Sequence, residues 1–369
     1  MEQFPYHIWR KLLKEIMIND NSELFQKGNF QGDLELRKAI MYYLRQSRGV
    51  HVHASQIVVA AGMENLLFLL RQILGEKVSI GIENPVYKNA YEILKELYFK
   101  IHPISMDESG MCVEQLQKTD ANLAYVTPAH QYPTGVIMPI GRRSQLLGWA
   151  KKDPDHYIIE DDYDSEFRFS GQPIPALQGL VADAPVVYIG TFSKTLYPGL
   201  RLGYVVIPRP LVSDLKHAHA ELYRGGHSLI QMALAEFITA GHYSAHIRRM
   251  RLLYSRRRAF LTELIQRHCM PYALSDFSDN AGLHLILNLP AEADDVAIAR
   301  EANARHILVR PLSRYYLTAA RKKGLLMGFA SQPEEQMASA FSVLLGCLQT
   351  HCPQMLLLRE DAEKQNAPT

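Results

Sequence analysis

Short apolar runs alternate with longer helical patterns over the first two hundred residues, and this alternation limits the folds the chain can adopt. The runs are rich in Val, Ile and Tyr and are too continuous for strands with one face in water. The segments between them, such as 63–74 and 142–152, have helical spacing. Buried strands connected by helices form parallel sheets. We therefore predict a largely parallel α/β sheet covered on both faces, with strands at 56–61, 77–82, 98–104, 122–127, 156–160, 185–190 and 201–207.

The pattern changes after about residue 220. A long basic helical stretch, 242–268, leads into three further strand candidates at 282–290, 306–312 and 323–330. This order predicts a smaller α+β domain after the sheet. We expect an N-terminal segment, 1–45, that packs on the small domain or at a dimer interface, then a large domain over 46–220, a small domain over 221–355 and a flexible tail over 356–369.

Composition excludes several functional classes. The chain has 369 residues, 47% of them hydrophobic and 21% charged, which is typical of globular proteins. A formal net charge of +2 gives no general attraction to nucleic acid or membranes. Four cysteines without a C-x-x-C pair indicate neither a zinc site nor a disulfide framework. No run approaches the roughly 18 apolar residues of a membrane span. We predict a cytoplasmic protein.

The stretch YIGTFSKTLYPGLRLGY, residues 188–204, places Lys194 directly after an apolar strand. A lysine at a strand end is most often simply solvated. Here Thr191 lies three residues before it and Arg201 seven residues after it, and the turn between them can bring both toward one point that would suit a phosphate. A lysine beside a bound phosphate cofactor is the arrangement that a Schiff base with pyridoxal phosphate requires.

Two further segments fit the same chemistry. IIEDDYDSEFRF, residues 158–169, ends a strand with Asp161, Asp162 and Tyr163. An acidic loop or a metal site is the alternative, but no histidine at ligand spacing accompanies it. A carboxylate stabilises a protonated pyridine nitrogen, and a tyrosine hydroxyl can bind the phenolic oxygen of that ring. VVAAGMENLL, residues 58–67, reads as strand, glycine and helix start, in which backbone N–H groups can hold a phosphate.

Together these segments resemble the aminotransferase-like domain of the MocR/GabR-type bacterial transcription regulators, itself similar to the fold-type-I pyridoxal-phosphate aminotransferases. The most specific matches are TPAHQYPTG (127–135), 158–169 and 188–204, and the resemblance runs from FPYHIW (4–9) through 323–330. It implies a fold-type-I PLP-dependent transferase, α/β, with a mostly parallel seven-stranded sheet and a smaller α+β C-terminal domain.

The resemblance implies catalytic roles for three residues. Lys194 would be the Schiff-base lysine, Asp161 the partner of the pyridine nitrogen, and Tyr163 the donor to the phenolic oxygen. Other residues would bind the cofactor. These are Thr191 and Arg201 at the phosphate with the backbone of Gly62 and Met63, Ser193 in the same turn, Tyr87 stacked on the ring unless it is only a core tyrosine, and His130 or Gln131 near the ring.

The sequence departs from that family at two places. Many relatives have a tyrosine five residues before a glycine, reaching the neighbouring subunit's phosphate, where this chain has Lys27 before Gly32. The usual arginine of the final small-domain strand, which grips the substrate carboxylate, is missing from GLLMGFA. Arg310 and Arg314 are the nearest replacements. We prefer Arg314, since bidentate carboxylate binding needs a guanidinium and its loop precedes the missing site; an exposed loop arginine is the alternative.

Two functions follow from the resemblance. In the first, the chain is the effector-sensing domain of a regulator: it binds pyridoxal phosphate, forms an external aldimine with a small amino compound, and acts as a homodimer because the family's site lies at a dimer interface. DNA would then be bound only through a winged-helix domain absent from this chain. In the second, it is a free-standing aminotransferase acting on an amino acid and a 2-oxo acid. Whether turnover occurs stays open.

The basic stretch 242–268 has its own alternatives. Six arginines lie in the segment from Arg248 through Arg258, interleaved with Leu, Met and Tyr at helical spacing. Such a pattern more often marks a solvated face over a packed one than a nucleic-acid contact. We therefore expect no DNA binding by this helix.

Overall fold

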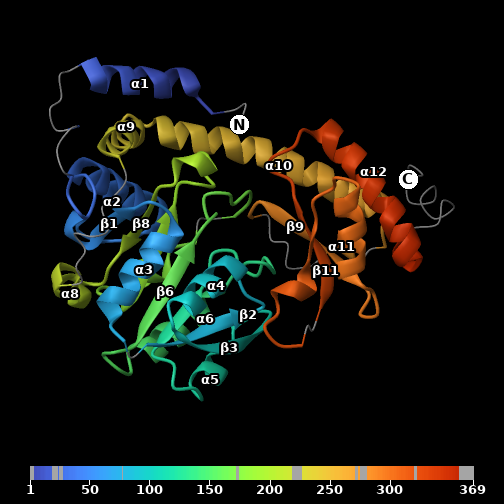
Figure 1. The fold of residues 1–369 in the computed structure, drawn as a ribbon, viewed down its shortest axis with the longest axis horizontal. Helices are drawn as coiled ribbons and strands as arrows, with labels where there is room; N and C mark the ends of the chain where they lie inside the picture. The colour runs from blue at the N-terminus through green and yellow to red at the C-terminus, as the bar shows by residue number, and fades with distance from the viewer. Residues whose placement is uncertain are drawn as a thin grey trace.

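The computed structural model describes residues 4–18, 24, 28–76, 78–171, 174–217, 227–270, 273–274, 281–319 and 322–356. Figure 1 shows a large sheet surrounded by helices, and a second, smaller sheet packed against helices α10, α11 and α12. The smaller α+β unit predicted after the large sheet is therefore present.

The described residues form an eight-stranded large sheet in the order β1-β8-β7-β6-β5-β2-β3-β4. Strands β7, β6, β5, β2 and β3 are parallel, and β8 runs antiparallel to both of its neighbours. The prediction of seven strands is wrong by one, because β4 is a two-residue strand that pairs with the end of β3 and has no apolar run of its own. The bounds are β1 (Ile57–Ala60), β2 (Ser79–Asn84), β3 (Lys100–Asp107), β4 (Gly110–Met111), β5 (Leu123–Val126), β6 (Tyr157–Asp162), β7 (Val186–Thr191) and β8 (Gly203–Val206).

Both faces of the large sheet are apolar, which is why its strands read as continuous hydrophobic runs. Alternate residues of one strand enter different cores, because successive side chains of a strand point to opposite faces. Val58 belongs to the core under α3 and α4, whereas Val59 belongs to the core under α1, α2 and α9. A third core, around α5 and α6, covers the rest of the second face.

Helices connect and cover the strands. They are α1 (Tyr6–Ile18), α2 (Leu34–Arg48), α3 (Met63–Leu74), α4 (Lys88–Glu96), α5 (Val113–Leu116), α6 (Ile140–Ala150), α7 (Leu177–Leu180), α8 (Val212–His217), α9 (Ser228–Thr239), α10 (His242–His268), α11 (Asp295–Ala304) and α12 (Glu334–His351). Short 3-10 helices are η2 (Ala54–Gln56), η3 (Pro198–Leu200), η4 (Arg209–Leu211), η7 (Leu312–Tyr315) and η8 (Pro353–Met355).

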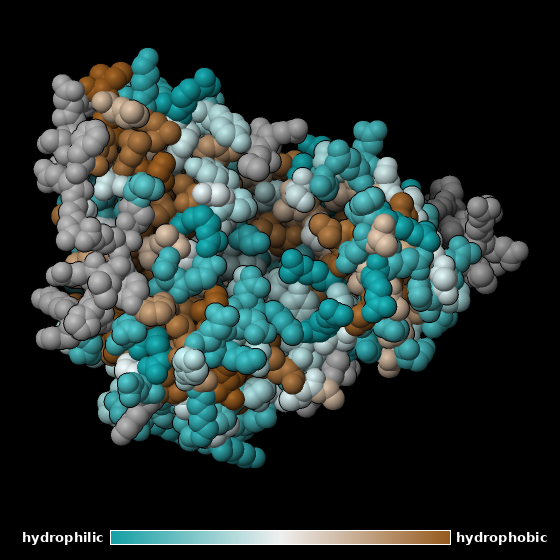
Figure 2. All heavy atoms as spheres, viewed as in Figure 1, coloured by the Kyte–Doolittle hydropathy of each residue, from teal (hydrophilic) through white to brown (hydrophobic). Residues whose placement is uncertain are grey.

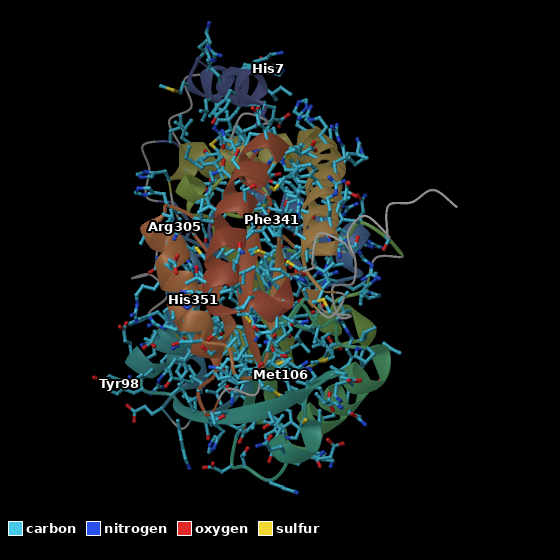
Figure 3. The ribbon with its side chains drawn as sticks, turned by 90° about the vertical axis from the view of Figure 1, so that its right-hand side faces the viewer. His7, Tyr98, Met106, Arg305, Phe341 and His351 are labelled. Carbon is cyan, nitrogen blue, oxygen red and sulfur yellow. The ribbon has the colours of Figure 1, made fainter. Side chains whose placement is uncertain are left out.

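The second sheet is antiparallel and has the order β10-β11-β9, with β9 (His284–Leu289), β10 (Arg310–Pro311) and β11 (Lys323–Gly328). Its core is formed with α10, α11 and α12. Glu301 joins two of these helices at the surface, since it pairs with Arg305 at 2.5 Å and with His351 of α12 at 2.6 Å. Figure 3 labels Arg305 and His351 on this side of the molecule.

The long helix α10 runs from α9 toward the second sheet (Figure 1). Tyr243, His246, Ile247 and Met250 are buried near its start. Its arginines are exposed or partly exposed. The helix thus has one packed and one solvated face, as expected for this stretch. Within the described ranges, no helix is long and apolar enough to cross a membrane, and no cluster of three metal-ligating side chains occurs.

The N-terminal helices leave apolar side chains in solvent. Tyr6, Met17 and Ile18 of α1 and Leu34 and Tyr42 of α2 are exposed large hydrophobic residues. Figure 2 shows hydrophobic residues gathered on the side of α1, opposite the more hydrophilic surface over α12. The predicted domain boundaries at 45, 220 and 355 stay predictions, and Lys27 lies outside the described residues.

Candidate functional site

The predicted site residues lie at one edge of the large sheet. Tyr87, His130, Tyr163 and Lys194 follow the carboxyl ends of β2, β5, β6 and β7, which are parallel. In open α/β sheets, ligands bind outside this edge. Strand β8 runs the other way, so its amino end, which Arg201 precedes, reaches the same edge.

The register of three strands gathers the predicted phosphate residues. Gly203 of β8 pairs with Ala60 of β1 on one side and with Thr191 of β7 on the other. Gly62 and Arg201, each two residues from these pairs, therefore lie side by side. A methyl group on Gly62 would come within 2.6 Å of Arg201 Nη2, so only glycine leaves this approach open.

Gly62 and Met63 also begin α3. Gly62 has φ +91°, which glycine adopts without strain, and Met63 is the first helical residue. Unpaired N–H groups of a helix start bind anions. Arg201 is exposed and pairs with Glu64 Oε2 of the same first turn at 2.7 Å. A carboxylate of the chain itself thus occupies the guanidinium that we expected to hold a phosphate.

Asp161 lies at the buried end of the site. Its side chain is 1% exposed, and its Oδ2 accepts a hydrogen bond from the Tyr125 hydroxyl. Its Oδ1 is buried and has no hydrogen-bond partner in the described part of the chain. Burial raises the pKa of Asp161 to about 7, with a further rise from nearby Asp162 and Asp164, and the Tyr125 hydrogen bond opposes the rise.

The neighbouring Asp162 points to the opposite face of β6 and is already paired. Its Oδ2 lies 2.8 Å from Arg48 Nε and accepts a hydrogen bond of 2.6 Å from the Tyr188 hydroxyl. Of the two adjacent aspartates, only Asp161 therefore offers an unpaired oxygen to a ligand.

Tyr163 and His130 are joined directly. His130 Nδ1 lies 2.9 Å from the Tyr163 hydroxyl and 2.9 Å from Asp164 Oδ2. Desolvation raises the pKa of Tyr163 well above its usual value, with the Asp164 charge second, so its hydroxyl stays protonated and can donate. His130 is also closed in by the segment just before β9, because a methyl group on Gly282 would overlap its ring.

Lys194 lies in the turn that follows β7. Its side chain is exposed, and it lines a cavity of about 550 Å³ together with Ser193, His246 and Arg257. Ser193 N donates to Thr191 Oγ1 at 3.2 Å, which shapes the turn. His246 Nε2 lies 3.0 Å from the Thr195 carbonyl oxygen and holds the turn from α10. The lysine is therefore accessible, on a backbone fixed at both sides.

Tyr87 is partly buried at the start of α4. Its ring lies 5.3 Å from that of Tyr132, nearly perpendicular to it. Burial, and next the charge of Asp161, raise the pKa of Tyr87 to about 12. The Gln131 amide is engaged within the protein, since its Nε2 donates to the Pro85 and Tyr132 carbonyl oxygens at 3.0 and 2.8 Å. His130 is thus the better placed of the two candidates.

Several residues of the site had no sequence signal strong enough to single them out. Tyr125 sits inside an apolar run, and Asp164 within an acidic one. His284 of β9 packs its ring 5.3 Å from His130, and Nε2 lies 2.9 Å from the Pro133 carbonyl oxygen. Burial lowers the pKa of His284 to about 3, so it is neutral. An acidic residue in the first turn of a predicted helix is a weak signal for Glu64, but only the fold shows that Glu64 contacts Arg201.

The residues present fit pyridoxal phosphate. Asp161 Oδ1 is an unpaired buried oxygen suited to a pyridine nitrogen, and Tyr163 is a protonated donor beside it. The Gly62 turn and Arg201 form a cradle at the start of a helix, and Lys194 stands exposed nearby. Among the residues that the structure describes, the Glu64 carboxylate opposes a phosphate there.

Comparisons with known proteins identify the family of the chain and several similar proteins. The family model for aminotransferase class I and II matches residues 2–344. An HTH-type transcriptional regulator of Bacillus subtilis, YdeL, is 38% identical over 92% of this chain and 73% of its own length. The probable rhizopine catabolism regulatory protein MocR of Rhizobium meliloti is 33% identical over 93% of this chain and 70% of its own length.

Solved structures agree on the fold. The kynurenine aminotransferase of Pyrococcus horikoshii superposes with a TM-score of 0.84 at 25% identity, covering 95% of this chain and 88% of its own. The multiple substrate aminotransferase of Thermococcus profundus gives 0.82 at 24% identity, covering 99% and 90%. The fold-type-I prediction is confirmed. The chain belongs to the aminotransferase class I and II family, and resembles within it the aminotransferase-like domains of MocR-type transcriptional regulators.

Proposed function

We propose that this chain binds pyridoxal phosphate through Lys194 and senses a small amino compound as the effector domain of a transcription regulator. The observation that carries the proposal is the buried, unpaired Oδ1 of Asp161 at the same sheet edge as the exposed Lys194. The similarity to YdeL and MocR supports the regulatory role. DNA binding, a cytoplasmic location and the homodimer belong to this proposal and stay untested.

When bound, pyridoxal phosphate supplies an aldehyde carbon that condenses with primary amines and a ring that withdraws electrons. Lys194 offers the amine that holds this carbon and can be displaced by another amine. Asp161 holds a proton at a pKa of about 7 and can give it to the ring nitrogen, after which its carboxylate stabilises the resulting cation. Tyr163, kept protonated by burial, donates to the phenolic oxygen, and His130 orients its hydroxyl.

The phosphate would lie against Gly62, Met63, Thr191 and Arg201. This placement requires the Arg201–Glu64 pair to open, because Glu64 holds Nη2 at 2.7 Å. A homodimer is supported by the exposed apolar residues of α1 and α2, which a partner subunit could cover.

The second candidate is a free-standing aminotransferase. The solved aminotransferases with TM-scores of 0.84 and 0.82 favour it, as does the presence of Lys194, Asp161 and Tyr163 together. In this case Lys194, once released, would also move the proton of the substrate Cα.

A visible absorption spectrum tests both candidates. The protein is mixed with pyridoxal phosphate, then with L- and D-amino acids and ω-amines, with and without a 2-oxo acid. We expect a band of the lysine-bound cofactor that Lys194→Ala loses. Absence of the band, or its persistence in Lys194→Ala, would refute covalent binding. A band shift by one amine without product indicates a sensor, and continued product formation indicates an aminotransferase.

A further inference from the structure

One face of helix α10 lines two cavities in succession. His246, Met250 and Arg257 line the cavity of about 550 Å³ that Lys194 also lines, and Leu261 lines a second cavity of about 340 Å³. Their spacing is that of a single helical stripe, since side chains four or seven positions apart lie on the same face. At a rise of about 1.5 Å per residue, the stripe extends over roughly 22 Å. The cavities therefore follow each other along one side of α10.

The two cavities are continuous. Four residues line both of them: Gly328, Ser331, Gln332 and Gln336. They belong to the end of β11, the turn after it and the first turn of α12. All four are exposed, so no packed wall formed by them divides the cavities. The cavities thus form a single groove, the α10–α12 groove, which leads from Lys194 to Leu261.

The end of the groove near Lys194 is polar. His246 Nε2 lies 3.0 Å from the Thr195 carbonyl oxygen, which places this end of the α10 stripe beside the lysine. Further along, Arg257 Nη1 donates to the Ala330 carbonyl oxygen. That bond joins α10 to the segment after β11, so the two sides of the groove are connected at its middle. A primary amine can therefore reach Lys194 among groups that form hydrogen bonds.

The far end of the groove is apolar. Phe341, which Figure 3 labels, lies there on α12. Leu308 also lines this end and is 86% exposed. Protein interiors are normally close-packed, and a cavity of about 340 Å³ lies within the range of small-molecule sites. Its buried lining residues all belong to the core of the second sheet: Leu261, Val309, Met327, Met337, Phe341 and Leu344.

We propose that the α10–α12 groove binds the apolar tail of the amino compound whose nitrogen reaches Lys194. The ligand is then a primary amine with an alkyl chain or ring several bonds from its nitrogen, not a compact polar amine. Its nitrogen meets the polar end, and its tail removes apolar surface from water at the other end. Because Lys194 belongs to the large sheet's unit and α12 to the second, such a ligand contacts both. This inference rests on the proposed function and names the class of its ligand.

A series of n-alkylamines from propylamine to decylamine tests the groove on the protein loaded with pyridoxal phosphate. Each amine is titrated by the shift of the visible band of the Lys194-bound cofactor. Full burial of one methylene strengthens binding by about fourfold. We expect the affinity to rise by about two- to fourfold per methylene among the longer amines, and to level off once the tail fills the far end.

Two substitutions fill the groove. Ala340 of α12 lines the apolar end, so Ala340→Leu should lower the affinity for octylamine about fivefold or more relative to that for propylamine. Gly328→Leu should act in the same way at the shared part, where a methyl group on Gly328 has no neighbour nearer than 4.0 Å. Ala338→Leu is the matched control, because Ala338 is also half-buried on α12 but lines neither cavity.

Each variant must show the wild-type band, which separates a filled groove from a misfolded protein. An affinity that does not change with chain length, in a wild type that shows the band, would overturn the inference and leave the proposed function standing. So would a rise that neither Ala340→Leu nor Gly328→Leu reduces, since the tail would then lie elsewhere. Absence of the band from the wild type would refute the proposed function and this inference with it.

Discussion

The two ends of the candidate site are built differently. At the ring end, Asp161 is 1% exposed, its Oδ2 is bound by Tyr125, and Tyr163 is held by His130. At the anion end, Arg201 and Glu64 are each more than half exposed and contact only through one ion pair at 2.7 Å. The ring end is formed by strands in the sheet interior, and the anion end by a turn and a helix start at the surface.

We expect the two ends to affect cofactor binding differently. Buried polar groups are costly when a partner is missing, so the ring end should determine most of the affinity for the cofactor and the protonation state of its ring. Exposed ion pairs contribute little and exchange readily. The anion end should therefore adjust affinity by small factors. Four predictions compare the two ends; three of them measure binding of a cofactor analogue, and one measures the stability of the protein without cofactor.

The largest effect is expected from Asp161→Ala. Removing one partner of a buried charge pair costs about 3–5 kcal/mol. We therefore expect the affinity for pyridoxamine phosphate, which has no aldehyde to react with Lys194, to fall about 100-fold or more. Fluorescence titration of the folded variant measures it. A loss of less than about tenfold would mean that the buried end does not dominate.

The pH dependence of stability is the second test. The folded pKa of Asp161 is about 7, above its unfolded value of about 3.9, so the folded protein binds the extra proton between these pH values. The free energy of unfolding without cofactor should therefore fall as pH rises from about 4 to 7. Asp161→Asn lacks this contribution, while Glu83 and Glu166, whose pKa values are also about 7, remain in both proteins.

Urea unfolding at pH 5 and pH 8 gives the comparison. We expect the free energy of unfolding of Asp161→Asn, measured relative to that of the wild type, to rise by roughly 2–3 kcal/mol from pH 5 to pH 8, at about 1.4 kcal/mol per pKa unit. Parallel changes in the two proteins would show that Asp161 is ionised in the unliganded protein.

Arg201→Ala should have a smaller effect than Asp161→Ala. A hydrogen bond to a charged group contributes about 1.5–3 kcal/mol, and solvent around Arg201 reduces it. We expect the affinity for pyridoxamine phosphate to fall about tenfold. Arg209→Ala is the matched control, because Arg209 is also exposed and ion-paired but lies at η4. Equal effects of the two substitutions would remove Arg201 from the site.

The smallest effect, and the only expected gain in affinity, is that of Glu64→Gln. This substitution frees Arg201 for a phosphate, so affinity should rise by roughly two- to fivefold, the range of an exposed pair. Glu35→Gln is the control: Glu35 is an exposed acid in the first turn of α2, paired with Lys38 at 2.8 Å. A fall in affinity with Glu64→Gln would show that Glu64 assists the ligand instead.

Much of the fold could be read from local patterns. The helices expected at 63–74 and 242–268 have those bounds in α3 and α10, because their apolar spacing and flanking glycines act locally. Strand β4 was not predicted, because a two-residue strand outside any apolar run shows no hydrophobic periodicity. Contacts between distant residues were not readable: Arg201 meets Glu64 across 137 positions, and only the fold brings them together.

The choice between Arg310 and Arg314 shows the same limit. The two arginines lie four residues apart in one segment and differ little in their flanking sequence. The fold distinguishes them only by position, since Arg310 pairs with Leu326 of β11 whereas Arg314 lies on η7, and this depends on how β10 and β11 align. Likewise, the DD pair of β6 suggested a cofactor partner, but only Arg48, 114 positions away, shows which of the two carboxylates is already neutralised.

The reversed direction of β8 has a consequence for how the site forms during folding. Thr191, Lys194 and Arg201 lie within eleven residues of one hairpin-like connection, so their meeting needs only the local pairing of β7 with β8. Local contacts close quickly, whereas distant ones bear the entropy of long loops. Asp161 and Tyr87 join through strands separated by many tens of residues. We expect the Thr191–Arg201 segment to be the early, fast-forming part of the site, whereas the ring end and the approach of Arg201 to Glu64 are completed only when the whole sheet assembles.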